Sequence, residues 1–117
     1  MNAYVNSLAG GKAVRSSARI EAFIRATDFD RPTLVLDTEL VAQQFRALKA
    51  GLGRADIHYA VKANPERAVI ETLVAEGSHF DAASRGEIEL CLGLGARPET
   101  ISFGNTIKKP VDIAFAY

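Results

Sequence analysis

The chain has 117 residues, enough for one small domain, and its 48% hydrophobic and 24% charged residues are typical of a soluble globular protein. Fourteen basic residues balance fourteen acidic ones, so no net charge favours binding to nucleic acid or to an anionic membrane. The single cysteine, Cys91, excludes an internal disulfide, and the absence of a signal-peptide core or membrane-length apolar run predicts a cytoplasmic protein.

The N-terminal part of the chain predicts a helix followed by a strand. Ile20, Phe23 and Ile24 recur at helical spacing within residues 17–26. Residues 33–36 form a short run, TLVL, of the kind found in strands.

A second helix is expected next, with Asp37 or Thr38 available to cap it. Gly51 and Gly53 would end it. One face of this helix carries four apolar side chains, those of Val41, Phe45, Leu48 and Leu52.

From residue 57 onward, a strand and a helix alternate. Strands are predicted at residues 57–61, 78–82 and 101–103. A helix opened by Asn64 and Pro65 and closed by Gly77 follows the first strand. Its apolar residues are Val69, Ile70, Leu73 and Val74.

The next two helices carry their own start signals. Ser84-x-x-Glu87 reads as a capping box after the second strand, and the apolar residues Ile88, Cys91 and Leu92 would face inward from the helix that it begins. Lys109-Pro110 starts a last helix, which runs to the end of the chain.

Alternating strands and helices predict an α/β fold made of parallel β-α units with right-handed crossovers. An eight-unit barrel needs roughly 250 residues, so three such units would be only its first part. We therefore expect the chain to be an N-terminal portion of a longer protein and to be inactive by itself.

The carboxyl ends of parallel strands carry the active sites of such folds, and three loops here meet that condition. They contain Lys62, then Asp81, then Gly104. A partly desolvated lysine amine can attack an aldehyde, and a carboxylate from Asp81 or Glu87 can orient its proton. The structural alternatives are a solvated surface lysine, a turn aspartate and, for Glu87, the capping box.

Other chemistry-bearing residues favour structural roles. His58 and His79 have no partner at metal-ligand spacing, so we expect structural histidines and no metal site. Cys91 lies among apolar residues and is expected to be a small core side chain. Gly93-x-Gly95 ends a helix, which is the wrong context for a dinucleotide-binding loop.

Two motifs resemble the ornithine/diaminopimelate/arginine decarboxylase family. Residues 58–65, HYAVKANP, resemble the family's Y-A-V-K-x-N segment, whose lysine carries pyridoxal 5'-phosphate as a Schiff base. Residues 77–88, GSHFDAASRGEI, are similar to its G-x-x-F-D-x-A-S-x-x-E-I pattern. Residues 101–109, ISFGNTIKK, are closer to the ornithine decarboxylase branch than to the diaminopimelate branch.

The resemblance implies the first three β-α units of a pyridoxal-phosphate-binding (β/α)8 TIM barrel in residues 38–117. Residues 1–37 would supply a helix and a strand associated with a second, β-rich domain. Lys62 would bind the cofactor, Ala60 would lie near its ring, and Asp81 and Glu87 would approach the lysine amine.

The implied activity is decarboxylation of a basic amino acid, foremost L-ornithine to putrescine in polyamine biosynthesis, by a homodimer with active sites at its interface. Diaminopimelate, lysine, arginine and carboxynorspermidine are alternative substrates within the family. A non-catalytic, partner-binding relative is a second alternative, which retention of Lys62, Asp81 and Glu87 disfavours. Alanine racemase has a similar V-K-A-N segment, but the continuation PERA at residues 65–68 departs from its pattern.

Overall fold

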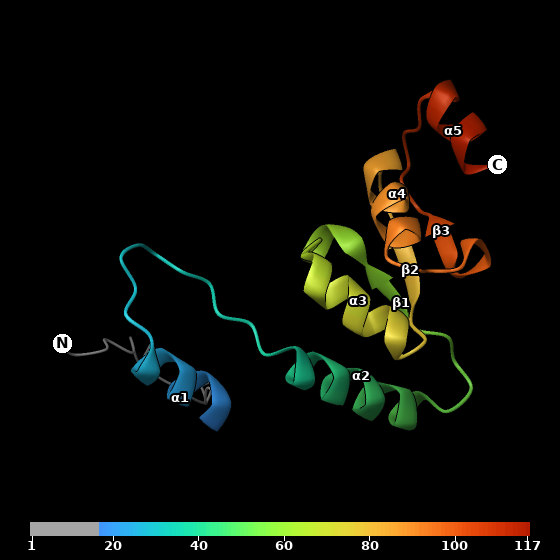
Figure 1. The fold of residues 1–117 in the computed structure, drawn as a ribbon. Coiled ribbons are helices and arrows are strands. Elements are labelled where there is room, and N and C mark those ends of the chain that lie inside the picture. The colour runs from blue at the N-terminus through green and yellow to red at the C-terminus, as the bar shows by residue number, and fades with distance from the viewer. Residues whose placement is uncertain (1–16) are drawn as a thin grey trace, which may run out of the picture. The chain divides into compact units, whose positions relative to one another are not determined.

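The structure, a computed structural model, describes residues 17–117 (Figure 1). The chain divides into two compact units, Met1–Asp37 and Thr38–Tyr117. The described part of the first unit holds one helix, and the second unit holds a three-stranded parallel sheet with four α-helices. The predicted α/β class with a parallel sheet is therefore confirmed for the second unit.

In the first unit, α1 (Ala18–Ala26) confirms the predicted helix. Its N-cap, Ser17, accepts a hydrogen bond from the Ile20 N–H at 3.1 Å, as a capping serine does. The strand predicted at residues 33–36 is wrong, because this segment has no regular secondary structure and its Leu34 is 80% exposed. A strand is held by hydrogen bonds to a neighbour, and none of the strands in residues 17–117 pairs with this segment.

The second unit alternates helices and strands. In chain order its elements are α2 (Thr38–Leu52), β1 (His58–Ala60), α3 (Arg67–Ala75), β2 (His79–Ala82), α4 (Arg85–Gly93), β3 (Ile101–Phe103) and α5 (Pro110–Ala116). Two short 3-10 turns, η1 (Val61–Ala63) and η2 (Pro98–Thr100), follow β1 and precede β3. The three predicted strands are confirmed, but the first ends at Ala60 because the chain turns into η1 there.

The strands lie in the order β1-β2-β3, and their register fixes two faces. Along β2, the exposure of successive side chains alternates: Phe80 and Ala82 are buried, and His79 and Asp81 are partly exposed. Paired residues of parallel strands share a face, and His58 pairs with His79, Ala60 with Asp81, and Asp81 with Ser102. We call the face made by His58, Ala60, His79, Asp81 and Ser102 the open face.

Two helices end in Schellman motifs, which turn the chain sharply back toward the sheet. After α3, Gly77 has a φ of +75°, its N–H donates to the Val74 carbonyl at 3.0 Å, and the Ser78 N–H donates to the Leu73 carbonyl at 2.9 Å. Gly95 repeats the arrangement after α4, with a φ of +91°. The left-handed backbone explains why the predicted helix ends coincide with glycines.

Two details of the helices differ from the sequence-based prediction. The helix expected to open at Asn64-Pro65 begins at Arg67, because Asn64 Oδ1 accepts the Glu66 N–H at 3.1 Å in an Asx turn that precedes the helix. Leu92, expected to face inward, is 38% exposed, whereas Cys91 is fully buried.

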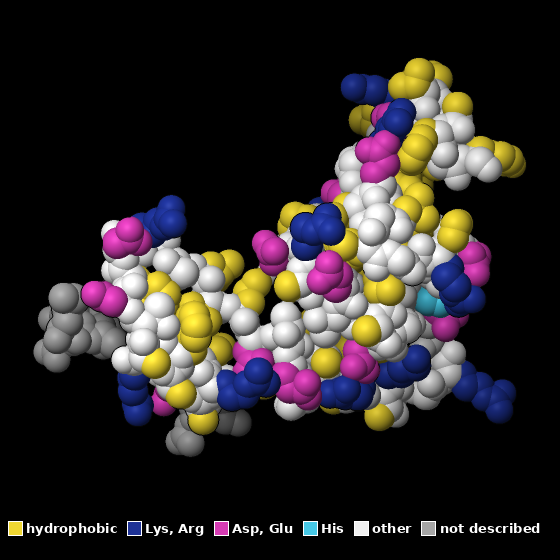
Figure 2. All heavy atoms as spheres, viewed as in Figure 1, with side chains coloured by type: hydrophobic (Ala, Val, Ile, Leu, Met, Phe, Trp, Pro, Cys, Tyr) yellow, Lys and Arg dark blue, Asp and Glu magenta, His cyan; other side chains and the backbone are white. Residues whose placement is uncertain are grey.

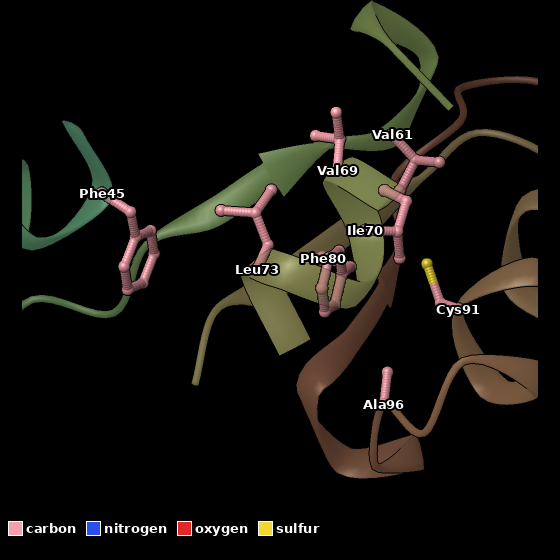
Figure 3. Close-up of a cluster of buried hydrophobic side chains, with 8 residues drawn as sticks. All are labelled: Phe45, Val61, Val69, Ile70, Leu73, Phe80, Cys91 and Ala96. Atoms are coloured by element: carbon pink, nitrogen blue, oxygen red, sulfur yellow. The ribbon is translucent and has the colours of Figure 1, made fainter. Parts of the chain in front are cut away.

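The core lies on the opposite side of the sheet from the open face, under the helices. Its fully buried members are Val61, Ile70, Phe80 and Cys91, one from each successive element between η1 and α4. Figure 3 shows the Cys91 sulfur directed into this cluster toward Ile70. Apolar side chains from β1, β2, α3 and α4 therefore form one continuous contact layer.

Charged side chains of both signs are interspersed over the second unit in the view of Figure 2. Arg46 of α2 pairs with two carboxylates. It lies 2.9 Å from Glu39 of the same helix and 2.8 Å from Glu76, which follows α3 and is thirty residues away in the sequence. This bridge joins α2 to α3 on the solvent side, where an ion pair contributes at most about 1 kcal/mol.

The buried thiol of Cys91 should make stability sensitive to alkaline pH. Burial, with a smaller effect of the nearby Glu87 carboxylate, raises the pKa of Cys91 from 9.0 to about 11. The folded state thus favours the protonated thiol, and this stabilisation is intact below pH 9 and is lost as the pH rises toward 11. We expect the melting temperature of wild type to fall more steeply over this interval than that of Cys91→Ala; parallel curves would contradict the assignment.

Candidate active site

The turn after β1 presents Lys62 at the carboxyl edge of the sheet. Val61 is fully buried and anchors η1 in the core, whereas Lys62, the next residue, is exposed. The ε-amine is thus available to a ligand at the strand end, and the loss of this side chain would leave no cavity in the core. The structure places Lys62 where the positional rule for parallel sheets expects a reactive group.

The same turn is closed by a side-chain hydrogen bond. The hydroxyl of Tyr59, on β1, donates to the carbonyl of Asn64 at 3.1 Å. Burial raises the pKa of Tyr59 above its ordinary value, so the hydroxyl remains a donor to higher pH than an exposed tyrosine would. This contact was not predicted from the sequence, in which only the resemblance to the Y-A-V-K-x-N segment drew attention to the tyrosine.

Asp81 lies on the open face at the carboxyl end of β2, paired with Ala60 of β1. Its carboxylate packs against Gly104, just after β3, so closely that a Cβ at position 104 would overlap it; the Asp81 Cγ lies 2.9 Å from that Cβ position. The Gly104 N–H donates to the Ala82 carbonyl at 3.0 Å and holds the backbone there. The missing side chain at position 104 is what gives the Asp81 carboxylate its room.

Glu87 caps the start of α4. Ser84 Oγ accepts the Glu87 N–H at 3.3 Å, and Glu87 Oε2 accepts the Ala83 N–H at 2.7 Å. A strict capping box would direct the carboxylate to the N–H of Ser84 itself, so the reciprocal bond is displaced by one residue. The structural alternative for Glu87 is therefore present in the folded chain, and its carboxylate is held where β2 ends.

The sheet brings Lys62, Ala60 and Asp81 to its carboxyl edge, but within the described part of the chain Lys62 makes no ion pair with a carboxylate there. Ala60 and Asp81 are register partners on adjacent strands, and Lys62 follows Ala60 by two residues. The ion pairs within residues 17–117 do not include one between Lys62 and either Asp81 or Glu87. The arrangement offers an accessible amine, a carboxylate on the neighbouring strand and a second carboxylate bound to backbone.

The two histidines lie at the opposite end of the open face. His58 and His79 pack edge to face, with ring centroids 4.9 Å apart. No cluster of three or more histidine, cysteine, aspartate or glutamate side chains within residues 17–117 could hold a metal ion. No helix within this described part is long and apolar enough to cross a membrane.

Comparisons with known proteins agree on one family. Residues 38–117 match the family described as pyridoxal-dependent decarboxylase, pyridoxal binding domain. The chain is 44% identical over 89 residues to the chloroplastic ornithine decarboxylase of Nicotiana glutinosa, and 44% identical over 78 residues to the ornithine decarboxylase of Mus pahari. These matches cover 76% and 67% of this chain but only 21% and 17% of the relatives, so the chain spans about a fifth of their length.

Solved structures give the same result. A lysine/ornithine decarboxylase from Vibrio vulnificus, complexed with putrescine, is 39% identical with a TM-score of 0.78, over 86% of this chain and 28% of that one. A lysine decarboxylase from Selenomonas ruminantium is 32% identical with a TM-score of 0.73, over 85% of this chain and 27% of that one.

Proposed function

Because this chain belongs to the pyridoxal-dependent decarboxylase family, through its pyridoxal-binding domain, we propose that the full-length protein decarboxylates a basic amino acid, with L-ornithine as substrate and putrescine as product. The observation that carries the proposal is the exposed Lys62 on the turn at the carboxyl end of β1, within a domain whose family binds pyridoxal phosphate. On this proposal the three β-α units are the first part of a (β/α)8 barrel.

The residues at this edge fit the cofactor. An exposed lysine amine can react with an aldehyde, and Ala60 presents only a methyl group on the open face beside Asp81, which leaves room for a flat ring. When bound, pyridoxal phosphate supplies the aldehyde that takes the amino group and a ring that accepts the electrons left by departing carbon dioxide. We therefore assign Lys62, Ala60 and Asp81 to cofactor binding.

The proposed chemical roles follow from these positions. Lys62 would hold the cofactor through its side-chain amine, and that amine would also hold or move a proton beside the substrate nitrogen. Asp81, whose carboxylate packs against Gly104, would present that carboxylate to the lysine amine and orient its protons. Glu87 offers a second carboxylate at the end of β2, although its bond to the Ala83 N–H must loosen or bend for it to reach the amine.

The substrate proposal rests on the named relatives. Both plant and mammalian ornithine decarboxylases match at 44% identity. Lysine is the second candidate, since a lysine/ornithine decarboxylase of Selenomonas ruminantium is 36% identical over 77 residues. The test compares kcat/KM of the full-length protein for carbon dioxide release from ornithine, lysine, arginine and diaminopimelate. We expect the highest value for ornithine and the next highest for lysine. Cofactor bound at Lys62 without release from any of the four would favour the non-catalytic alternative.

We extend the proposal to domain organisation, location, assembly and pathway. Residues 1–37 would accompany a β-rich second domain, and residues 38–117 would form the first part of the cofactor-binding barrel. The full-length protein would be a cytoplasmic homodimer with active sites at its interface and a role in polyamine biosynthesis. Separate expression of the two proposed domains tests the domain division, and sedimentation tests the homodimer.

Replacing Glu87 with glutamine separates its capping role from a catalytic one. Glutamine can still accept the Ala83 N–H, so we expect an unchanged melting temperature. If the carboxylate acts on the Lys62 amine, turnover should fall tenfold or more, which corresponds to about 1.4 kcal/mol in the barrier. Glu89→Gln is the matched control, because Glu89 lies two residues further along α4 and pairs with Arg85 on the exposed side. Unchanged turnover in Glu87→Gln would leave Glu87 a capping residue alone.

A further inference from the structure

Lys62 lies in the middle of a loop that one side chain closes. The bond from the Tyr59 hydroxyl to the Asn64 carbonyl joins residues five positions apart, and Lys62 lies between them. The interior of the loop is η1, whose Val61 is fully buried. The path of the backbone through Lys62 is thus constrained by a core anchor before it and by a hydrogen bond across it.

The helices hold the ring of Tyr59 from the other side. Tyr59 pairs with Phe80 in the sheet and therefore shares the face that packs on the helices, opposite Ala60. It lines an apolar hollow with Phe45 and Leu48 of α2 and Leu73 of α3, the other lining residues being Leu40, Val41, Gln44 and Ile57. The ring also packs, partly buried, against the core cluster, while its hydroxyl bonds the turn, so one side chain connects the packing of the helices to the turn.

The Asn64 carbonyl, which accepts from Tyr59, lies outside the hydrogen bonds of the helix. The first carbonyl to accept from the helix is that of Glu66, which takes the N–H groups of Val69 and Ile70 at 3.0 and 3.1 Å. Asn64 precedes the helix with extended backbone, and its side chain is occupied by the Glu66 N–H. The N–H groups of the helix therefore do not bond the Asn64 carbonyl, and the Tyr59 hydroxyl is its donor.

We propose that Tyr59 is a positioning residue for Lys62: its hydroxyl holds the turn between β1 and α3 so that the lysine amine stays at the carboxyl edge of the sheet. This inference rests on the proposed function of Lys62. Tyr59 lies on the helix-facing side of the sheet, opposite the open face assigned to the cofactor, so on this proposal it acts through the turn. The alternative is that Tyr59 serves packing alone, for which the ring suffices and the hydroxyl is dispensable.

Tyr59→Phe in the full-length protein separates these roles, since it keeps the ring and removes only the hydroxyl. We expect the melting temperature to change little, kcat to fall roughly tenfold and KM for ornithine to stay nearly constant. Independently of activity, deuterium exchange at the amides of residues 61–64 should become faster. When the apoprotein is reconstituted with pyridoxal phosphate and samples are reduced with borohydride over time, peptide mapping should show the adduct on Lys62 accumulating more slowly in the variant. Thr72→Val, which removes a hydroxyl that donates to the Ala68 carbonyl within α3, is the matched control.

The outcomes separate this inference from the proposed function. If Lys62 is trapped in wild type, and Tyr59→Phe matches wild type in exchange, trapping rate and kcat, Tyr59 is a packing residue and the inference is overturned. If Tyr59→Phe fails to fold, the hydroxyl is needed for folding as a whole and not specifically for the position of Lys62, and the inference is likewise wrong. If the trapped lysine is not Lys62 in wild type, the proposed function itself fails, whatever the exchange data show.

Discussion

Lys62→Ala in the full-length protein is expected to lower turnover by several orders of magnitude and to abolish the covalent linkage to the cofactor, while the fold survives. Alanine has no amine to react with an aldehyde and none to move a proton at the substrate nitrogen. The side chain is exposed, and the neighbouring Val61 keeps its buried position, so little packing is lost. Exposed substitutions of this kind change stability by less than about 0.5 kcal/mol.

The measurement combines cofactor absorbance, borohydride trapping with peptide mapping, and ornithine-dependent carbon dioxide release. Lys109→Ala is the matched control, because Lys109 is also exposed and also follows a strand of the sheet. We expect this control to retain both the linkage and the turnover. A reduced adduct on Lys108 or Lys109 in wild type would show that Lys62 is not the cofactor lysine.

Phe80→Ala should destabilise the fold far more than any substitution at the candidate active site. Phe80 lies at the centre of the middle strand with no exposed surface, in the same cluster as Val61, Ile70 and Cys91. Truncating a fully buried phenylalanine removes its transfer free energy and leaves a cavity, a cost of about 3–5 kcal/mol. Because Asp81 follows directly in the chain, activity should fall together with stability.

Urea unfolding of the full-length protein, with the free energy taken from the transition that exposes this domain, measures the loss. Phe23→Ala is the matched control, since Phe23 is 51% exposed on α1 and should lose far less. Equal losses for the two variants would mean that the cluster around Phe80 is not the core of this unit. A Phe80→Leu variant, which refills part of the space, should recover some of the stability.

The local signals of the sequence determined the helices and the order of the elements. Apolar residues at helical spacing predicted α1 and α2, and Gly77 and Gly95 marked helix ends because only glycine adopts their left-handed backbone cheaply. The alternation of strand and helix predicted the parallel sheet, and the order of strands placed Lys62 at its carboxyl edge. Helix positions and helix ends depend on residues a few positions away in the chain, so they can be predicted from the sequence alone.

Pairing and side-chain contacts were decided only by the tertiary structure. Residues 33–36 have the composition of a strand but no partner within residues 17–117, and composition does not supply one. Glu87 was predicted to bond the Ser84 N–H, yet it bonds that of Ala83, the first residue after β2.

The site shows the same division. The sequence by itself determined which residues lie at the strand ends, among them Lys62, Asp81 and Gly104. Only the structure showed that the Asp81 carboxylate fills the space of a missing side chain at Gly104, and that the Tyr59 hydroxyl reaches Asn64. These contacts depend on strand register and on the packing of helices over one face, which bring together groups that no sequence spacing relates.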